Sequence, residues 1–262
     1  MSLTLDIGAT GMLAQQLNVN TISNNIANMT TTGYKRQRAE FQDLLYQTKI
    51  RPGAASSDAS TTTPSGIQQG LGVKAGSVYR ISEQGALQTT SNKFDLATIG
   101  QGYFQVTLPS GETAYTRDGS FQLDQTGRVV TSMGYRMQPN MTIPSGATDV
   151  TINSSGQVLV KIDGQTALTN AGQIQLATFP NDAGLEAVGN NLSLITEASG
   201  AALVGNPGST GYGTLQQGML EASNVNVVEE ITALIQAQRA YEMNSKVIQT
   251  GDQMLNTITQ LR

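Results

Sequence analysis

Hydrophobic positions near the N-terminus recur with the period of a helix. The apolar stripe consists of Leu5, Met12, Val19, Ile22, Ile26 and Met29. Steps of one heptad, with an intermediate step of three, predict an amphipathic helix over about 5–29. Gly8, Gly11 and several asparagines lower its helix propensity. We therefore expect this helix to need a partner that covers its stripe.

The other end of the chain repeats the pattern more cleanly. Its stripe consists of Leu234, Ala237, Tyr241, Asn244, Ile248, Gly251, Leu255 and Ile258. This spacing predicts a long helix over about 227–261, with Asn224 or Asn226 as its N-cap. Glu229 and Glu230 stand in the first turn, where the helix dipole favours acidic side chains. Both stripes are most economically buried against one another or against further copies, so we expect them to be self-assembly surfaces.

The middle of the chain has a different pattern. Residues 36–72 are expected to form a linker and an extended arm, because the stretch between Arg51 and Gly72 is rich in Gly, Ser, Thr and Pro. From 73 to 213, short runs of Val, Ile, Thr, Tyr and Phe alternate with turn sequences such as Asp118-Gly119. This spacing favours an antiparallel all-β domain, a sandwich or a barrel.

These patterns together predict an α+β protein built from several parts. Long N- and C-terminal helices form a coiled-coil-like pair, and an antiparallel all-β domain is inserted between them. The expected parts are an N-terminal helix over 1–35, the linker and arm over 36–72, the β domain over 73–213 and a C-terminal helix over 214–262.

Composition narrows the possible functions. Only 13% of the residues are charged, against about 25% in an average protein, and the chain contains neither His nor Cys. Thiol and imidazole catalysis and the usual ligands of zinc are therefore excluded, and we expect no cofactor. A net charge of -4 argues against nucleic acid as a partner. No stretch approaches the roughly 18 apolar residues of a membrane helix, and we find no signal-peptide pattern, so we expect no membrane insertion.

Two patterns could carry chemistry, and each has a simpler interpretation. Gly70 to Ala75 matches a dinucleotide-binding pattern, but it follows a linker and precedes no helix. Glu112, Asp118 and Asp124 could act as the paired carboxylates of a glycosidase. Turn chemistry explains each of them better, since Asp118-Gly119 and Asp124-Gln125-Thr126-Gly127 are typical hairpin turn sequences.

Four stretches carry a family resemblance. They are SNNIANMTTTGYK over 23–35, GYFQV over 102–106, YTRDGSFQLDQTGRVVTSMGYRMQP over 115–139, and 223–258 at the C-terminal end. In these motifs the chain resembles the bacterial flagellar rod and hook proteins. The signature positions are Asn25, Asn28, Gly33, Tyr34, Asn224, Asn226, Gln238, Arg239 and Tyr241. In its length and in the segment 41–78, the chain resembles the distal rod members of the family more than the proximal rod members or the longer hook members.

The resemblance implies a structural subunit and no enzyme. Such a subunit leaves the cell through the flagellar type III export apparatus without a cleaved signal. It polymerises into a helical tube that spans the periplasm, transmits torque and lines the export channel. The implied partners are copies of itself, the proximal rod proteins, the hook or hook-junction proteins, and the P- and L-ring proteins. A secreted peptidoglycan-active enzyme, or another axial protein such as the proximal rod, remains the alternative.

Overall fold

The computed structural model describes residues 3–52, 65–163 and 167–260, and its backbone divides into two compact units. The first unit combines the N-terminal residues up to Ile26 with 37–79 and with the chain from Val227 onward. The second unit combines 27–36 with 80–226. Each unit therefore joins segments from both halves of the sequence.

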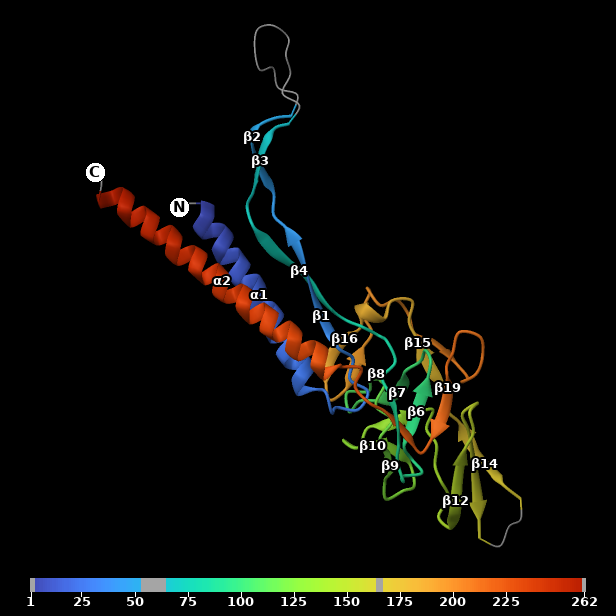
Figure 1. The fold of residues 1–262 in the computed structure, drawn as a ribbon. Coiled ribbons are helices and arrows are strands. Elements are labelled where there is room, and N and C mark those ends of the chain that lie inside the picture. Colours follow the sequence, from blue (N-terminus) through green and yellow to red (C-terminus); the bar gives the residue numbers. More distant parts are fainter. Residues whose placement is uncertain (1–2, 53–64, 164–166, 261–262) are drawn as a thin grey trace. The chain divides into compact units, whose positions relative to one another are not determined.

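Two helices dominate the first unit. They are α1 (Leu3–Ala27) and α2 (Val227–Gln260), and they run side by side in opposite directions (Figure 1). Gly11 of α1 faces Asn244 of α2, and Leu5 faces Gly251. Both helices lie where the heptad patterns predict them. The fold is α+β, as expected, with a helix at each end and antiparallel strands between.

The first unit also contains a ribbon that is two strands wide and is built from two successive strand pairs. The strands are β1 (Gln37–Asp43), β2 (Tyr46–Ile50), β3 (Ile67–Gly70) and β4 (Val73–Arg80). β1 pairs with β4 and β2 pairs with β3, so the two pairs follow one another along the ribbon. The N–H of Leu44 donates to the carbonyl oxygen of Gly72 at 2.8 Å, which carries the hydrogen bonding across the junction between the pairs.

The ribbon and the strands near residue 214 differ from the expected boundaries. Residues 36–72 were predicted to be a linker and an arm, but the described part of that segment forms β1, β2 and β3. The central part of the arm, 53–64, lies outside the described residues. Strands also continue beyond 213, to Glu221, and belong with the β-rich unit. β2 is exposed at every position and has no alternation of buried and exposed residues, and β20 has only three residues, too few to show the period of a strand.

The second unit is built almost entirely of short strands. They are β5 (Leu87–Thr89), β6 (Leu96–Ile99), β7 (Phe104–Thr107), β8 (Thr113–Thr116), β9 (Phe121–Leu123), β10 (Val129–Thr131), β11 (Arg136–Gln138), β12 (Ala147–Ile152), β13 (Gln157–Ile162), β14 (Thr169–Gln173), β15 (Leu176–Thr178), β16 (Glu186–Gly189), β17 (Leu192–Leu194), β18 (Leu203–Gly205), β19 (Thr214–Gln217) and β20 (Met219–Glu221), with a 3₁₀ turn η1 (Asp182–Gly184). Among the described residues, the largest sheet has the order β16-β17-β8-β7-β11-β10-β9.

The core of this unit lies where that sheet meets the β12-β13-β14 sheet. Phe104 and Phe121 are fully buried and meet edge to face, with ring centroids 5.2 Å apart. In β13, Val158 and Val160 are buried while the alternate residues are more exposed, which is the period of a strand with one buried face. Hydrophobic burial of this kind supplies the main driving force for folding the unit.

Replacing Phe104 with alanine tests this core. We expect Phe104→Ala to lower the free energy of unfolding by about 3–5 kcal/mol, because it removes a buried ring and leaves a cavity. Leu168→Ala is the matched control, since Leu168 is 55% exposed. Urea unfolding followed by tyrosine fluorescence measures both variants. Equal stability of the two variants would show that Phe104 is not part of the core.

Candidate functional site: the helix pair and a buried charge cluster

Glycines allow α1 and α2 to approach closely. A Cβ atom at Gly8 would lie 2.8 Å from Cγ1 of Ile248, and one at Gly251 would lie 3.2 Å from Cδ2 of Leu5. A Cβ at Gly11 would lie 2.8 Å from Nδ2 of Asn244. Because the distance between helix axes depends on the side chains at the contact, larger residues at these positions would push the helices apart.

Asn25 connects α1 to two other parts of the first unit. Its Nδ2 donates to the carbonyl oxygen of Gln37 at 2.8 Å, and its Oδ1 accepts from the N–H of Gln37 at 2.8 Å. Nδ2 also lies 3.2 Å from Oε2 of Glu230 in α2. Both side chains are buried. A buried amide whose donor and acceptor are both used fixes its neighbours in place, so this signature residue has a structural role.

The predicted assembly stripes are partly covered in the single chain. Ile22, Ala237 and Gly251 are buried, whereas Met29, Tyr241 and Leu255 remain exposed. The half-buried members are Leu5, Met12, Val19, Ile26, Leu234, Asn244 and Ile248. The side chain of Ile258 lies outside the described residues. The structure therefore brings Leu5, Gly251 and Ile248 to the contact between the helices.

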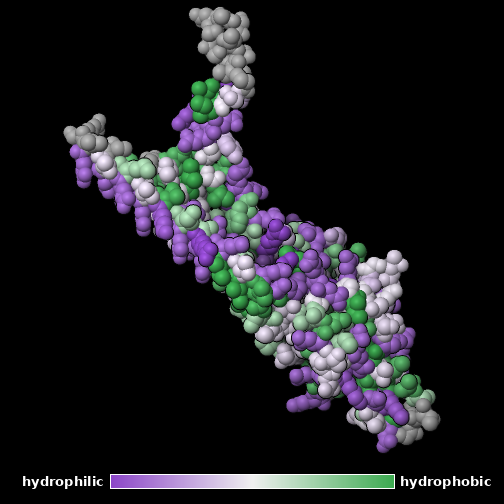
Figure 2. Space-filling view, viewed as in Figure 1, coloured by the Kyte–Doolittle hydropathy of each residue, from purple (hydrophilic) through white to green (hydrophobic). Residues whose placement is uncertain are grey.

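α2 carries a second set of hydrophobic side chains that the heptad analysis did not predict. Its exposed members are Val228, Ile231, Ile235, Met243, Val247 and Met254. Figure 2 shows a row of polar side chains along one edge of α2 and hydrophobic surface beside it. Exposed apolar side chains on a helix are candidates for burial in an interaction site.

Signature residues of α2 line a groove in the first unit. The groove has a volume of about 340 Å³ and is lined by Gln16, Val19, Gln238, Tyr241 and Glu242. Arg239 is exposed beside it. Tyr241 therefore presents its ring to this groove and to solvent, and is not buried between the helices.

The second unit contains a buried charge cluster. Nζ of Lys35 lies 2.6 Å from Oε1 of Glu221, and the two side chains are only 7% and 1% exposed. Lys35 also donates to the carbonyl oxygen of Glu83 at 2.7 Å. On the other side of the carboxylate, Nη1 of Arg117 lies 3.6 Å from Oε2 of Glu221. Burial lowers the pKa of Lys35, and the bond to Glu221 opposes this effect.

Signature residues surround the cluster. The N–H of Gly33 donates to the carbonyl oxygen of Glu221 at 2.7 Å, and Gly33 has a φ of 67°. A Cβ there would lie 2.8 Å from the backbone of Arg117, so no larger residue fits. Oδ1 of Asn28 accepts from the Thr31 hydroxyl at 3.1 Å within the same segment.

Asn224 and Asn226 have different positions. Oδ1 of Asn224 accepts from the N–H of Arg36 at 2.7 Å, and its Nδ2 donates to the carbonyl oxygen of Ile81 at 3.0 Å. Asn224 therefore braces two neighbouring segments of the second unit. Asn226 directly precedes α2 and stands at the N-cap position.

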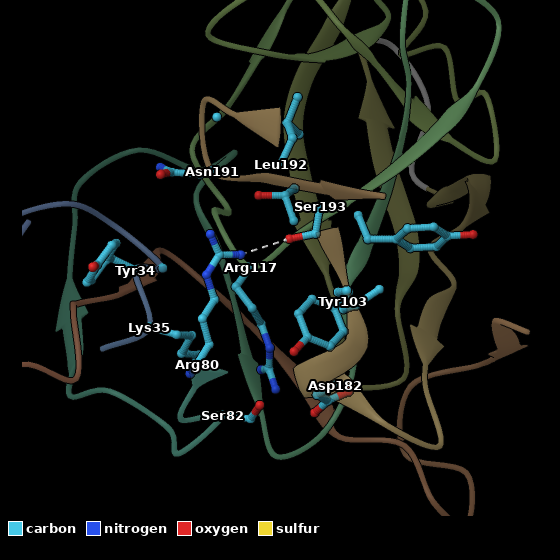
Figure 3. A pocket seen from close by; sticks show the side chains of 15 residues that line it. Tyr34, Lys35, Arg80, Ser82, Tyr103, Arg117, Asp182, Asn191, Leu192 and Ser193 are labelled. Carbon is cyan, nitrogen blue, oxygen red and sulfur yellow. Dashed lines mark hydrogen bonds between the residues drawn. The ribbon is translucent and has the colours of Figure 1, made fainter. Parts of the chain in front are cut away.

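A small cavity lies beside the charge cluster. It has a volume of about 80 Å³, and Figure 3 shows Tyr34, Arg80, Arg117, Tyr103, Ser82 and Asp182 around it. The guanidinium of Arg117 lies over the ring of Tyr103, 5.1 Å from its centroid. Nη1 of Arg80 donates to the Ser193 hydroxyl at 3.3 Å.

The candidate catalytic carboxylates form hydrogen bonds within turns of the chain. Oδ1 of Asp124 accepts from the N–H groups of Thr126 and Arg128, and Oδ1 of Asp118 accepts from the N–H of Ser120. Glu112 interacts with Ser110 in an exposed turn. Within 3–52, 65–163 and 167–260, we find no group of acidic side chains that could hold a metal ion. In the same ranges, no helix is both apolar enough and long enough to cross a membrane.

Sequence reasoning missed the charged members of these sites. Glu230 was assigned only to the helix dipole, and Glu221 and Arg117 were given no role. The sequence contains only a weak indication of their importance. Charged residues make up 13% of this chain, so each one is a candidate for a specific interaction. The pairing itself had no signal, since Lys35 and Glu221 are 186 positions apart.

Comparison with known families agrees with these motifs. The family described as "Flagella basal body rod protein" matches residues 5–35. The "Flagellar hook protein FlgE/F/G D1 domain" matches 97–160, and "Flagellar basal body rod FlgEFG protein C-terminal" matches 216–261. The three matches cover the helical ends and the first part of the β-rich unit, which defines the class of flagellar axial proteins.

Individual relatives narrow this class. The chain is 61% identical to "Flagellar basal-body rod protein FlgG" of Caulobacter vibrioides, over 98% of each chain. It is 51% identical to the protein of the same name from Buchnera aphidicola, over 98% of this chain and 99% of the relative. It is 40% identical to the protein of the same name from Bacillus subtilis, over 97% of each chain. The chain therefore belongs to the flagellar basal-body rod protein FlgG family, whose members are structural subunits of the distal rod.

A double-mutant cycle tests the charge cluster. We expect Lys35→Met to lower the free energy of unfolding by about 3–5 kcal/mol, because it leaves Glu221 buried without its close cation. Lys35→Met combined with Glu221→Leu should recover part of that loss. Asp149→Asn is the control, since its pair with Lys93 is exposed to solvent and should contribute little to stability. Chemical denaturation measures all variants, and strictly additive losses would contradict a direct interaction.

Proposed function

We propose that this chain polymerises with copies of itself into a helical tube in which α1 and α2 form a coiled-coil-like pair at the centre. In this proposal the β-rich part, about 73–213, is an inserted outer domain. The observation that supports this proposal most is that α2 leaves apolar side chains exposed in the single chain. One face of α2 packs against α1 at Gly8 and Leu5, while apolar side chains elsewhere on α2 are exposed.

The energetics of α2 favour burial by further copies. Burying an apolar side chain of this size contributes about 1.5–3 kcal/mol. Val228, Met243 and Met254 are each more than 60% exposed, so much of that contribution is unrealised in the single chain. Tyr241 and Gln238, which line the open groove, would also be covered by a neighbouring subunit. The self-assembly residues of both heptad stripes, from Leu5 to Met29 and from Leu234 to Ile258, thus form the centre of the proposed polymer.

The exposed end of the ribbon is a further contact in this proposal. Leu45, Tyr46 and Ile67 are exposed by 82%, 56% and 54%. Docking of these side chains on an adjacent subunit would brace the tube and stiffen it. The strands supply backbone hydrogen bonds within the ribbon, and these side chains, together with the exposed Ile50, supply apolar area at its end.

The location and partners follow from the proposed polymer. The subunit would leave the cell through the flagellar type III exporter without a cleaved signal and assemble across the periplasm. It would meet proximal rod proteins at one end, hook or hook-junction proteins at the other, and P- and L-ring proteins around its outside. It would transmit torque along the tube and line the export channel.

A non-enzymatic role is also part of the proposal. Asp118 and Asp124 are engaged by backbone N–H groups, which favours turn formation over acid–base chemistry. The alternative of a peptidoglycan-active enzyme predicts that purified protein clears a peptidoglycan suspension. Our proposal predicts no clearing, and sedimentable filaments instead.

Substitution of Ile248 tests the proposed centre of the polymer. Ile248→Asp places a charge beside Gly8 and should abolish motility, because burying an unpaired charge costs on the order of several kcal/mol in each subunit. Gln249→Asp is the matched control on an exposed position of the same helix. Soft-agar motility and electron micrographs of basal bodies measure assembly, and the secreted amount separates failed export from failed assembly. A motile Ile248→Asp strain would contradict the proposal.

A further inference from the structure

We propose that the cavity between Arg80 and Arg117 in the β-rich unit binds a carboxylate group. This cavity is separate from the helix surfaces considered for assembly, and all of its lining residues belong to the second unit. The proposal does not depend on polymer formation.

The charge around the cavity favours an anion. Three cationic side chains line it, namely Lys35, Arg80 and Arg117, against one carboxylate, Asp182. Glu221 is not part of the lining; Lys35 lies 2.6 Å from one of its oxygens and Arg117 lies 3.6 Å from the other. In the described part of the chain, Arg80 is therefore the lining cation without a carboxylate partner. Arg80 has no carboxylate within ion-pair distance among the described residues, and its Nη1 donates to the neutral hydroxyl of Ser193 at 3.3 Å. The lining therefore has a positive excess that a bound anion would neutralise.

Arg117 has unused hydrogen-bond donors although it is buried. Its side chain is 5% exposed, and only Nη2 is satisfied, by the carbonyl oxygen of Gly100 at 2.8 Å. Within the described part of the chain, Nε has no hydrogen-bond partner, and Nη1 has only the ion-pair contact with Oε2 of Glu221 at 3.6 Å, which is longer than a hydrogen bond. Buried donors of this kind are rare in folded proteins, because leaving one unpaired is costly. A ligand oxygen in the cavity would satisfy them.

The shape of the site selects a carboxylate among anions. The volume of about 80 Å³ holds a carboxylate with its adjoining carbon, but no sugar or nucleotide. A guanidinium presents parallel donors that match the two oxygens of a carboxylate. Hydroxyls of Ser82 and Tyr103 lie at the same cavity (Figure 3) and offer neutral donors. Asp182 on the lining disfavours a dianion, so a singly charged group fits better than a phosphate dianion.

Acetate is the simplest probe of this site. In the full-length protein, the Nε–Hε NMR signals of Arg80 and Arg117 should shift saturably with sodium acetate, at constant ionic strength set by sodium chloride. Arg80→Gln should weaken binding at least about tenfold, since it removes a charged hydrogen-bond donor. Arg80→Lys keeps the positive charge but loses the paired N–H donors of the guanidinium. Its affinity for acetate should lie between those of the unmodified protein and Arg80→Gln. Arg136→Gln is the control, because Arg136 is exposed and does not line the cavity.

The outcomes separate the proposal from a nonspecific charge effect. Shifts that do not saturate, or that chloride alone reproduces, would overturn it, as would equal binding by Arg80→Gln and Arg136→Gln. A thermal melt of each variant establishes that the β-rich unit is folded. In assembled rods, retained acetate binding identifies the ligand as a free small carboxylate. Loss of acetate binding on assembly identifies it as an Asp or Glu side chain of another copy.

Discussion

Contacts between residues from opposite ends of the sequence hold both units together. Asn25 and Glu230 meet in the first unit although they are 205 positions apart, and Lys35 and Glu221 meet in the second at a separation of 186. Closing so long a loop has an entropy cost that grows only slowly with length. Helix packing at Gly8 and the buried ion pair at Glu221 offset that cost. In the second unit, the pairing of β19 with β6 and of β20 with β5 also holds the C-terminal segment.

The terminal helices were well predicted from the sequence. The heptad stripes indicated helices over about 5–29 and 227–261, and α1 and α2 end within two residues of those limits. Turn sequences were equally informative, because Asp124 and Gly127 form the turn between β9 and β10 that their residue types indicate. In both cases the signal is local, so neighbouring residues alone are enough to produce it.

The ribbon and the charge cluster could not be predicted in the same way. Every residue of β2 is exposed, so its sequence has no alternation of buried and exposed positions and is typical of a linker. The partner of Glu221 is fixed by the tertiary fold, and no spacing rule connects it to Lys35. Tyr241 of the heptad stripe is exposed at a groove in the single chain, and the heptad spacing alone does not distinguish a position that packs within the chain from one that is left open.

A cysteine cross-link tests the central claim, which is that α1 and α2 of one chain pack against each other at Gly8. The protein has no cysteine, so a single pair can be introduced without competing thiols. A Cβ at Gly8 lies close enough to Ile248 for a disulfide. Oxidation of the Gly8→Cys/Ile248→Cys protein in rods should give an intramolecular cross-link, seen as a faster monomer band on a non-reducing gel. Ala9→Cys/Gln249→Cys, with both residues exposed, should not cross-link within the chain. Equal intramolecular cross-linking of both pairs, or of neither, would contradict the account.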